Sequence, residues 1–133
     1  MRATDVLIVD DDAELREFLV TSLTLEGYQV SAAANGADAL AHLRGSGPVA
    51  VILLDLSMPV MDGWTFCRQQ QSDERFAEIP VILSSASLDT PDRPRPIVAA
   101  LEKPIDFREV LSVIRTYCPE RKSCAARSSS RRP

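Results

Sequence analysis

Five polar residues have types and spacing that point to shared chemistry: Asp10, Asp11, Asp55, Ser85 and Lys103. Clustered carboxylates repel one another, so they either take up protons or recruit a cation. Oxygen ligands with few chelating groups fit Mg²⁺, which keeps several waters and shares its shell with a phosphate. Lys103 would neutralise another side of that phosphate, and the Ser85 hydroxyl would bond a third oxygen. The set predicts a phosphoryl-transfer site with Asp55 as the nucleophile.

Buried strands would position these residues. The run Val51–Leu54 lacks polar alternation, which is typical of a strand buried on both faces, and it ends on Asp55. A carboxylate there is costly unless something pairs with it. In open α/β sheets ligands gather outside the carboxyl ends of the strands, where Asp55 would lie. The predicted strands are Asp5–Val9, Tyr28–Ala32, Val49–Leu54, Val81–Ser84 and Val98–Leu101.

Helical patterns separate most of these strands. One helix follows Asp12, with Leu15, Phe18, Leu19 and Leu23 on one face; a second follows Asn35, with Ala37, Leu40 and Ala41 inward. A third runs from Asp62 to about Gln71, and a capping box at Asp106–Glu109 opens the last. This alternation predicts a parallel sheet covered on both faces. Pro91, Pro94 and Pro96 argue against a regular helix between Ser85 and Lys103.

Each candidate also has an ordinary explanation. Asp10–Asp12 could cap the first helix, Ser84 and Ser85 could be strand-end residues, and Lys103 could be a solvated lysine. Their joint position at the carboxyl ends of four strands is much harder to attribute to chance.

Composition limits the class of protein. A chain of 133 residues has room for one core. No apolar run approaches the ~20 residues that span a bilayer, and the N-terminus does not read as a signal peptide, so we expect a cytoplasmic protein without membrane contact. The three cysteines are odd in number and lack metal-type spacing, which fits a reducing compartment and argues against a disulfide framework.

The net charge of −4 is unevenly distributed. Residues 120–133 hold five basic residues and one acidic residue, which leaves ten basic and eighteen acidic residues, a charge of −8, in residues 1–119. An acidic body with a small basic tail is not the footprint of a folded nucleic-acid binder. We predict one domain over 1–119 and a disordered Ser/Arg-rich tail over 120–133.

Four stretches together resemble the response-regulator receiver domain: Ile8–Asp12, Leu54–Gly63, Ser84–Ala86 and Glu102–Pro104. The resemblance covers about residues 4–118 in order and spacing, and its motifs are specific. It implies an α/β fold, a flavodoxin-like doubly wound sheet of five parallel strands in the order 2-1-3-4-5. The proline-broken segment implies that the fourth helix is short or missing.

The resemblance also implies a role for each site residue. Asp55 would be the phosphorylation site, Lys103 would pair with the phosphoryl group, and Ser85 would supply the switch hydroxyl. Lys103–Pro104 would be a cis peptide. The implied Mg²⁺ ligands are Asp10, mainly through water, Asp11, Asp55 and the backbone carbonyl of Ser57. Ala100 departs from the family, because many relatives carry a switch aromatic there.

These residues imply two-component phosphorelay signalling. A sensor histidine kinase or a histidine phosphotransfer protein would donate to Asp55, and the phosphorylated state would alter binding of a downstream protein. Such a domain is not a conventional enzyme, since it catalyses only its own phosphorylation and dephosphorylation. We expect no DNA-binding domain after residue 118, because too few residues follow to build one.

Three alternatives stand beside this interpretation. A haloacid-dehalogenase-type phosphatase would need a second carboxylate, which Asp55-Leu56-Ser57 lacks. A nucleotide-binding flavodoxin relative would need a glycine-rich loop where this chain has three aspartates. A receiver-like docking module that works without phosphorylation remains open: the intact acidic site counts against it, and the altered segment before Lys103 counts for it.

Overall fold

A computed structural model describes residues 4–45, 48–55, 63–85 and 97–118, with only the backbone described at Gly63 and Trp64. Strands and helices alternate along most of the chain. In chain order the elements are β1 (Thr4–Val9), α1 (Ala13–Leu25), β2 (Val30–Ala33), α2 (Gly36–Gly45), β3 (Val49–Asp55), α3 (Gly63–Gln71), β4 (Val81–Ser85), β5 (Ile97–Glu102) and α4 (Phe107–Tyr117).

The strands form one parallel sheet in the order β2-β1-β3-β4-β5. This confirms the predicted flavodoxin-like, doubly wound arrangement. From β1 the chain moves outward to β2, then crosses back over β1 to β3 and continues in the opposite direction. The strand order therefore reverses between β1 and β3, and such a reversal opens a crevice at the carboxyl ends of the two strands.

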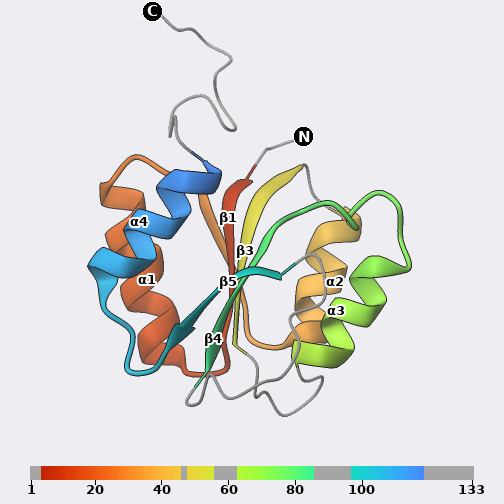
Figure 1. Ribbon diagram of the computed structural model, residues 1–133, viewed down its shortest axis with the longest axis horizontal. Coiled ribbons are helices and arrows are strands. Elements are labelled where there is room, and N and C mark those ends of the chain that lie inside the picture. The colour runs from red at the N-terminus through yellow and green to blue at the C-terminus, as the bar shows by residue number, and fades with distance from the viewer. Residues whose placement is uncertain (1–3, 46–47, 56–62, 86–96, 119–133) are drawn as a thin grey trace, which may run out of the picture.

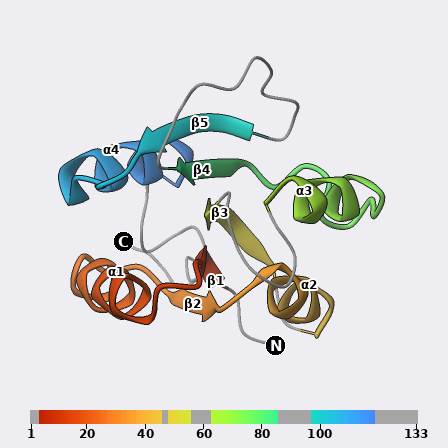
Figure 2. The same ribbon diagram turned by 90° about the horizontal axis from the view of Figure 1, so that it is seen from below.

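The sheet separates two apolar layers. Helices α1 and α4 cover one face, and α2 and α3 cover the other (Figures 1 and 2). Along β3, Val51 and Leu53 pack into the α1/α4 layer, whereas Ile52 and Leu54 pack into the α2/α3 layer. The central strand is therefore buried on both faces, which explains its continuous apolar run.

Three of the four described helices, α1, α2 and α3, connect one strand to the next, and α4 follows β5. The longest, α1, has 13 residues, and no helix among the described residues is long and apolar enough to cross a membrane. Residues 86–96, where a short or missing helix was expected, lie outside the described residues, as does the predicted tail over 120–133.

Two predicted helix faces are right only in part: Leu19 and Leu23 of α1 and Leu40 of α2 are buried as predicted, but other members of the two sets are not. Phe18 was expected to face inward but is 52% exposed, and its ring packs edge-on against Phe107 with the ring centroids 5.9 Å apart. In α2 the expected inward residues Ala37 and Ala41 are exposed. Apolar residues occur nearly all round the first turns of α2, so the pattern alone does not select a face. The buried residues of α2 are Gly36, Ala39, Leu40 and Leu43.

The cysteines also differ from expectation. Cys118, at the end of α4, is disulfide-bonded, which the argument against a disulfide framework did not anticipate. Cys67 on α3 is free and buried. Whether two cysteines can be bridged depends on their distance and orientation in space, which sequence spacing does not give.

Candidate functional site

Two buried carboxylates stand at the carboxyl ends of adjacent strands. β1 and β3 are paired through Val9 and Leu54, so the next two residues lie beside each other: Asp10 directly after β1, and Asp55 as the last residue of β3. Asp10 is 3% exposed and Asp55 is 4% exposed. Burial of two like charges in one crevice requires a positive partner.

Asp11 completes an acidic cluster. Its side chain is exposed, in contrast to its two neighbours in the cluster. One carboxylate oxygen from each of Asp10, Asp11 and Asp55 lies within 4.8 Å of the others. These three aspartates, which the sequence predicted to converge, do lie together.

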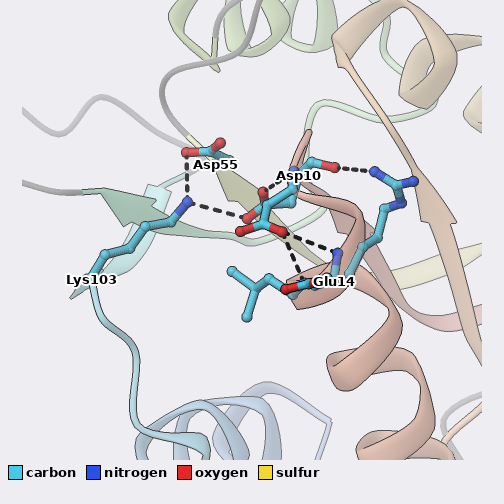
Figure 3. A network of polar contacts seen from close by, with 7 residues as sticks. Asp10, Glu14, Asp55 and Lys103 are labelled. Atoms are coloured by element: carbon cyan, nitrogen blue, oxygen red, sulfur yellow. Dashed lines mark hydrogen bonds and ion pairs between the residues drawn. The ribbon is translucent and has the colours of Figure 1, made fainter.

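Lys103 supplies the positive partner. It follows β5, and its Nζ lies 3.3 Å from Asp10 Oδ2 and 3.3 Å from Asp55 Oδ1. Figure 3 shows the side chain reaching between the two carboxylates. Burial alone would lower the pKa of Lys103, but the negative charges of Asp10 and Asp55 and the hydrogen bonds to them raise it above its ordinary value. The peptide between Lys103 and Pro104 is cis, as the resemblance implied.

The segment before α1 is held by several hydrogen bonds. The backbone N–H of Asp12 donates to Asp10 Oδ1 at 2.9 Å. Asp12 Oδ1 accepts from the N–H groups of Glu14 and Leu15 at 3.0 and 3.2 Å, so Asp12 caps the helix as predicted. Arg16 Nη1 donates to the backbone carbonyl of Asp10 at 2.8 Å.

Sequence reasoning did not identify Arg16. One signal was available: the N-terminal turn of a helix favours acidic side chains, and a basic residue there is unfavourable without a specific partner. Arg16 stands four residues after the helix-capping Asp12, and its partner is a backbone carbonyl, which no side-chain pattern reveals.

The two serines of β4 occupy different environments. Ser85 is half-buried, and its carbonyl accepts from the backbone N–H of Lys103 at 2.7 Å. Ser84 is 2% exposed and is paired in register with Asp55. Among the described residues the Ser84 hydroxyl has no hydrogen-bond partner. The sequence placed both serines at the end of this strand and gave the phosphate contact to Ser85 alone, and the structure adds the buried Ser84 hydroxyl on the residue paired with Asp55.

The sequence also singled out two positions outside this group of side chains, Ser57 and Ala100. Ser57, the candidate carbonyl ligand, lies outside the described residues. Ala100 is half-buried on β5 and packs against the α2/α3 layer. It has no ring that could swing between positions.

The donor set fits a hard divalent cation. Asp10, Asp11 and Asp55 offer oxygen atoms only, at the edge of the sheet, and Asp11 is open to solvent. Oxygen ligands with open positions for water suit Mg²⁺ better than a transition metal. The nearby ammonium of Lys103 would suit the negative charge of a phosphoryl group at the same place.

Comparisons with known proteins agree with this description. The sequence matches the family model "Response regulator receiver domain" over residues 6–115. The transcriptional regulatory protein GltR of Pseudomonas aeruginosa is 38% identical over 121 residues, which cover 83% of this chain and 47% of GltR. The chain thus spans about half the length of the first curated relatives it matches.

Solved structures share the fold. Chemotaxis protein CheY4 of Vibrio cholerae superposes with a TM-score of 0.77 at 26% identity, over 86% of this chain and 98% of that chain. The response regulator protein TrrA of Thermotoga maritima, solved in complex with Mg²⁺ and BeF, superposes with a TM-score of 0.73 at 24% identity, over 88% and 99% of the two chains. The second likeness concerns the fold alone.

The fold and the family match together define the class of protein: a receiver domain, which is a phospho-acceptor signalling domain. The chain belongs to the response regulator receiver domain family of two-component systems.

Proposed function

We propose that Asp55 accepts a phosphoryl group from a phosphohistidine of a sensor histidine kinase or a histidine phosphotransfer protein. One observation carries the proposal: the buried Asp55 carboxylate lies 3.3 Å from Lys103 Nζ and within the cluster that includes Asp10 and Asp11. A carboxylate nucleophile needs neighbours that accept the charge of the incoming group, and these residues supply that environment. A cytoplasmic location, where such kinases act, belongs to the same proposal.

The transfer exchanges one bond to phosphorus for another and needs no oxidant or reductant. A carboxylate oxygen of Asp55 forms a bond to phosphorus as the P–N bond to the donor imidazole breaks. The electron pair of the broken bond stays on the imidazole nitrogen. Lys103, held between Asp10 and Asp55 in the resting protein, pairs with the transferred phosphoryl oxygens, and the Ser85 hydroxyl donates to another of them.

Mg²⁺ belongs to this proposal. Asp11, Asp55 and the backbone carbonyl of Ser57 would hold it, with Asp10 acting mainly through water. When bound, the ion would neutralise the charge between the carboxylates and the phosphoryl oxygens. The oxygen-only donor set of the acidic cluster supports this assignment.

The phosphorylated state is proposed to change the binding of a downstream protein. Ala100 cannot act as a switch aromatic, so the change would depend on Ser85 and the backbone around it. Ser85 is connected to Lys103 by the 2.7 Å backbone hydrogen bond, which joins the carboxyl ends of β4 and β5.

Intact-mass spectrometry with a small acyl phosphate and Mg²⁺ tests the proposal. The wild type is expected to gain one phosphoryl group, and Asp55→Asn is expected to gain none. Asp38→Asn, which removes an exposed carboxylate from the first turn of α2, is the matched control and should label like the wild type. A wild type that never labels would favour the docking module that works without phosphorylation.

A further inference from the structure

No side-chain contact described so far fixes the direction in which the Asp11 carboxylate points. Its exposed carboxylate forms no hydrogen bond or ion pair with the described residues, whereas Asp10 contacts both Lys103 and the N–H of Asp12. The direction of the Asp11 side chain therefore depends on its backbone. That backbone is set by the two peptide planes on either side of its Cα.

Both planes are fixed by named contacts. The plane between Asp10 and Asp11 contains the Asp10 carbonyl, which accepts from Arg16 Nη1 at 2.8 Å. The plane between Asp11 and Asp12 contains the Asp12 N–H, which donates to Asp10 Oδ1 at 2.9 Å. One plane is thus held by a half-buried guanidinium and the other by the buried Asp10 carboxylate.

Arg16 is well placed to hold its plane. Its backbone N–H donates to the Asp12 carbonyl at 2.9 Å, so the residue is anchored in the first turn of α1. The Asp10 carbonyl lies beyond the last residue of β1 that is paired with β3, where the ladder provides no continuing partner. A hydrogen bond from a charged donor is stronger than one from a neutral group.

We propose that Arg16 is a positioning residue for Asp11: it fixes the Asp10–Asp11 peptide so that the Asp11 carboxylate faces the divalent cation. The inference rests on the proposed function. It assigns to Arg16 a role through the backbone and no contact with the metal.

A purely electrostatic role predicts the opposite result. Arg16 carries a positive charge near an acidic cluster, so charge alone would make its removal strengthen binding of a cation. A positioning role makes removal weaken binding, because Asp11 is no longer held toward the ion. The sign of the change in affinity therefore distinguishes the two.

Calorimetric titration of the unphosphorylated protein with Mg²⁺ alone is the test. Arg16→Gln is expected to raise the dissociation constant for Mg²⁺ about tenfold. This is the lower end of the range that is typical when a group that orients a metal ligand is removed. Arg16→Lys, which keeps a positively charged donor, should fall between the wild type and Arg16→Gln, and it preserves the test if Arg16→Gln does not fold. Arg115→Gln is the matched control. It also removes one positive charge, but from an exposed arginine that pairs with Glu26 and is far from Asp11 in the sequence.

A double-mutant cycle tests whether Arg16 affects Mg²⁺ binding through Asp11. In an Asp11→Asn background, Arg16→Gln should change the dissociation constant by less than about twofold, because the group that Arg16 orients is already lost. Unchanged or tighter Mg²⁺ binding by Arg16→Gln, or full additivity with Asp11→Asn, would overturn the inference while leaving the proposed function intact. A wild type that binds no Mg²⁺ would overturn both.

Discussion

The ammonium nitrogen of Lys103 lies at the same distance, 3.3 Å, from a carboxylate oxygen of Asp10 and from one of Asp55. The lysine is thus the internal counter-ion of two aspartates on neighbouring strands. A divalent cation placed among the same carboxylates would compete with it for their charge.

Replacing Lys103 with Met should therefore destabilise the metal-free protein and tighten Mg²⁺ binding. We expect a loss of about 1–2 kcal/mol, less than for a fully buried pair, because the lysine side chain is 26% exposed. Added Mg²⁺ should recover most of this loss. Thermal unfolding with and without Mg²⁺ measures both effects, with Lys103→Arg as the control that keeps the charge. Equal stabilisation of Lys103→Met and the wild type by Mg²⁺ would contradict the competition.

The thiol of Cys67 should resist alkylation in the folded protein. Burial in the α2/α3 layer raises the pKa of Cys67 to about 11, against a weaker lowering effect of Arg68. At pH 8 only about one thiol in a thousand would be ionised, and the thiolate is the reactive form. Iodoacetamide should label Cys67 slowly in buffer and rapidly in denaturant, as followed by mass spectrometry under conditions that leave the Cys118 disulfide intact. Rapid labelling of the native protein would argue against this burial.

The buried carboxyl of Asp5 should make the stability of the protein depend on pH. Burial raises the pKa of the Asp5 carboxyl, and the hydrogen bond from the Gln29 N–H to Asp5 Oδ2 only partly offsets this. The folded state therefore binds the proton more tightly than the unfolded state. The contribution of Asp5 to stability falls as the pH rises from its ordinary pKa through the raised value.

Asp5→Asn keeps the acceptor for Gln29 without the charge. Its free energy of unfolding relative to the wild type should rise as the pH increases above the ordinary pKa of an aspartate, and should level off once the pH has passed the raised pKa of Asp5. Urea unfolding at several pH values measures the difference, and Asp38→Asn controls for the loss of one negative charge. A difference that is constant with pH would contradict the raised pKa.

We also propose that residues 120–133 form a tail outside the folded domain, because they offer no apolar periodicity to bury. A chain truncated after Pro119 should unfold within about 2 °C of the full chain. The comparison is made in a reducing agent, so that the disulfide at Cys118 does not contribute. A drop of several degrees would show that the tail packs against the domain.

The sequence predicted the sheet because β1, β3 and β4 each contain a continuous apolar run, and runs of that kind are typical of strands covered on both faces. It predicted the cluster of Asp10, Asp11 and Asp55 because the carboxyl ends of parallel strands meet at one edge.

Other features depend on distances in space, which the sequence does not contain. Phe18 follows the apolar spacing of α1, yet its ring packs against Phe107 from the surface. The Arg16 contact ends on a backbone carbonyl, and the Cys118 disulfide required two sulfur atoms to meet. None of these is encoded by spacing along one helix or strand.

The partners Asp10 and Lys103 are 93 positions apart in the chain. A ribosome adds about 5–20 residues per second, so Asp10 and Asp55 emerge seconds before the lysine that neutralises them. Until β5 has been made and has docked beside β4, the two aspartates have no counter-ion from Lys103. The charge balance among these side chains is thus established only after Lys103 has been made, and a chain broken off before Lys103 would lack it even if its first three strands had paired.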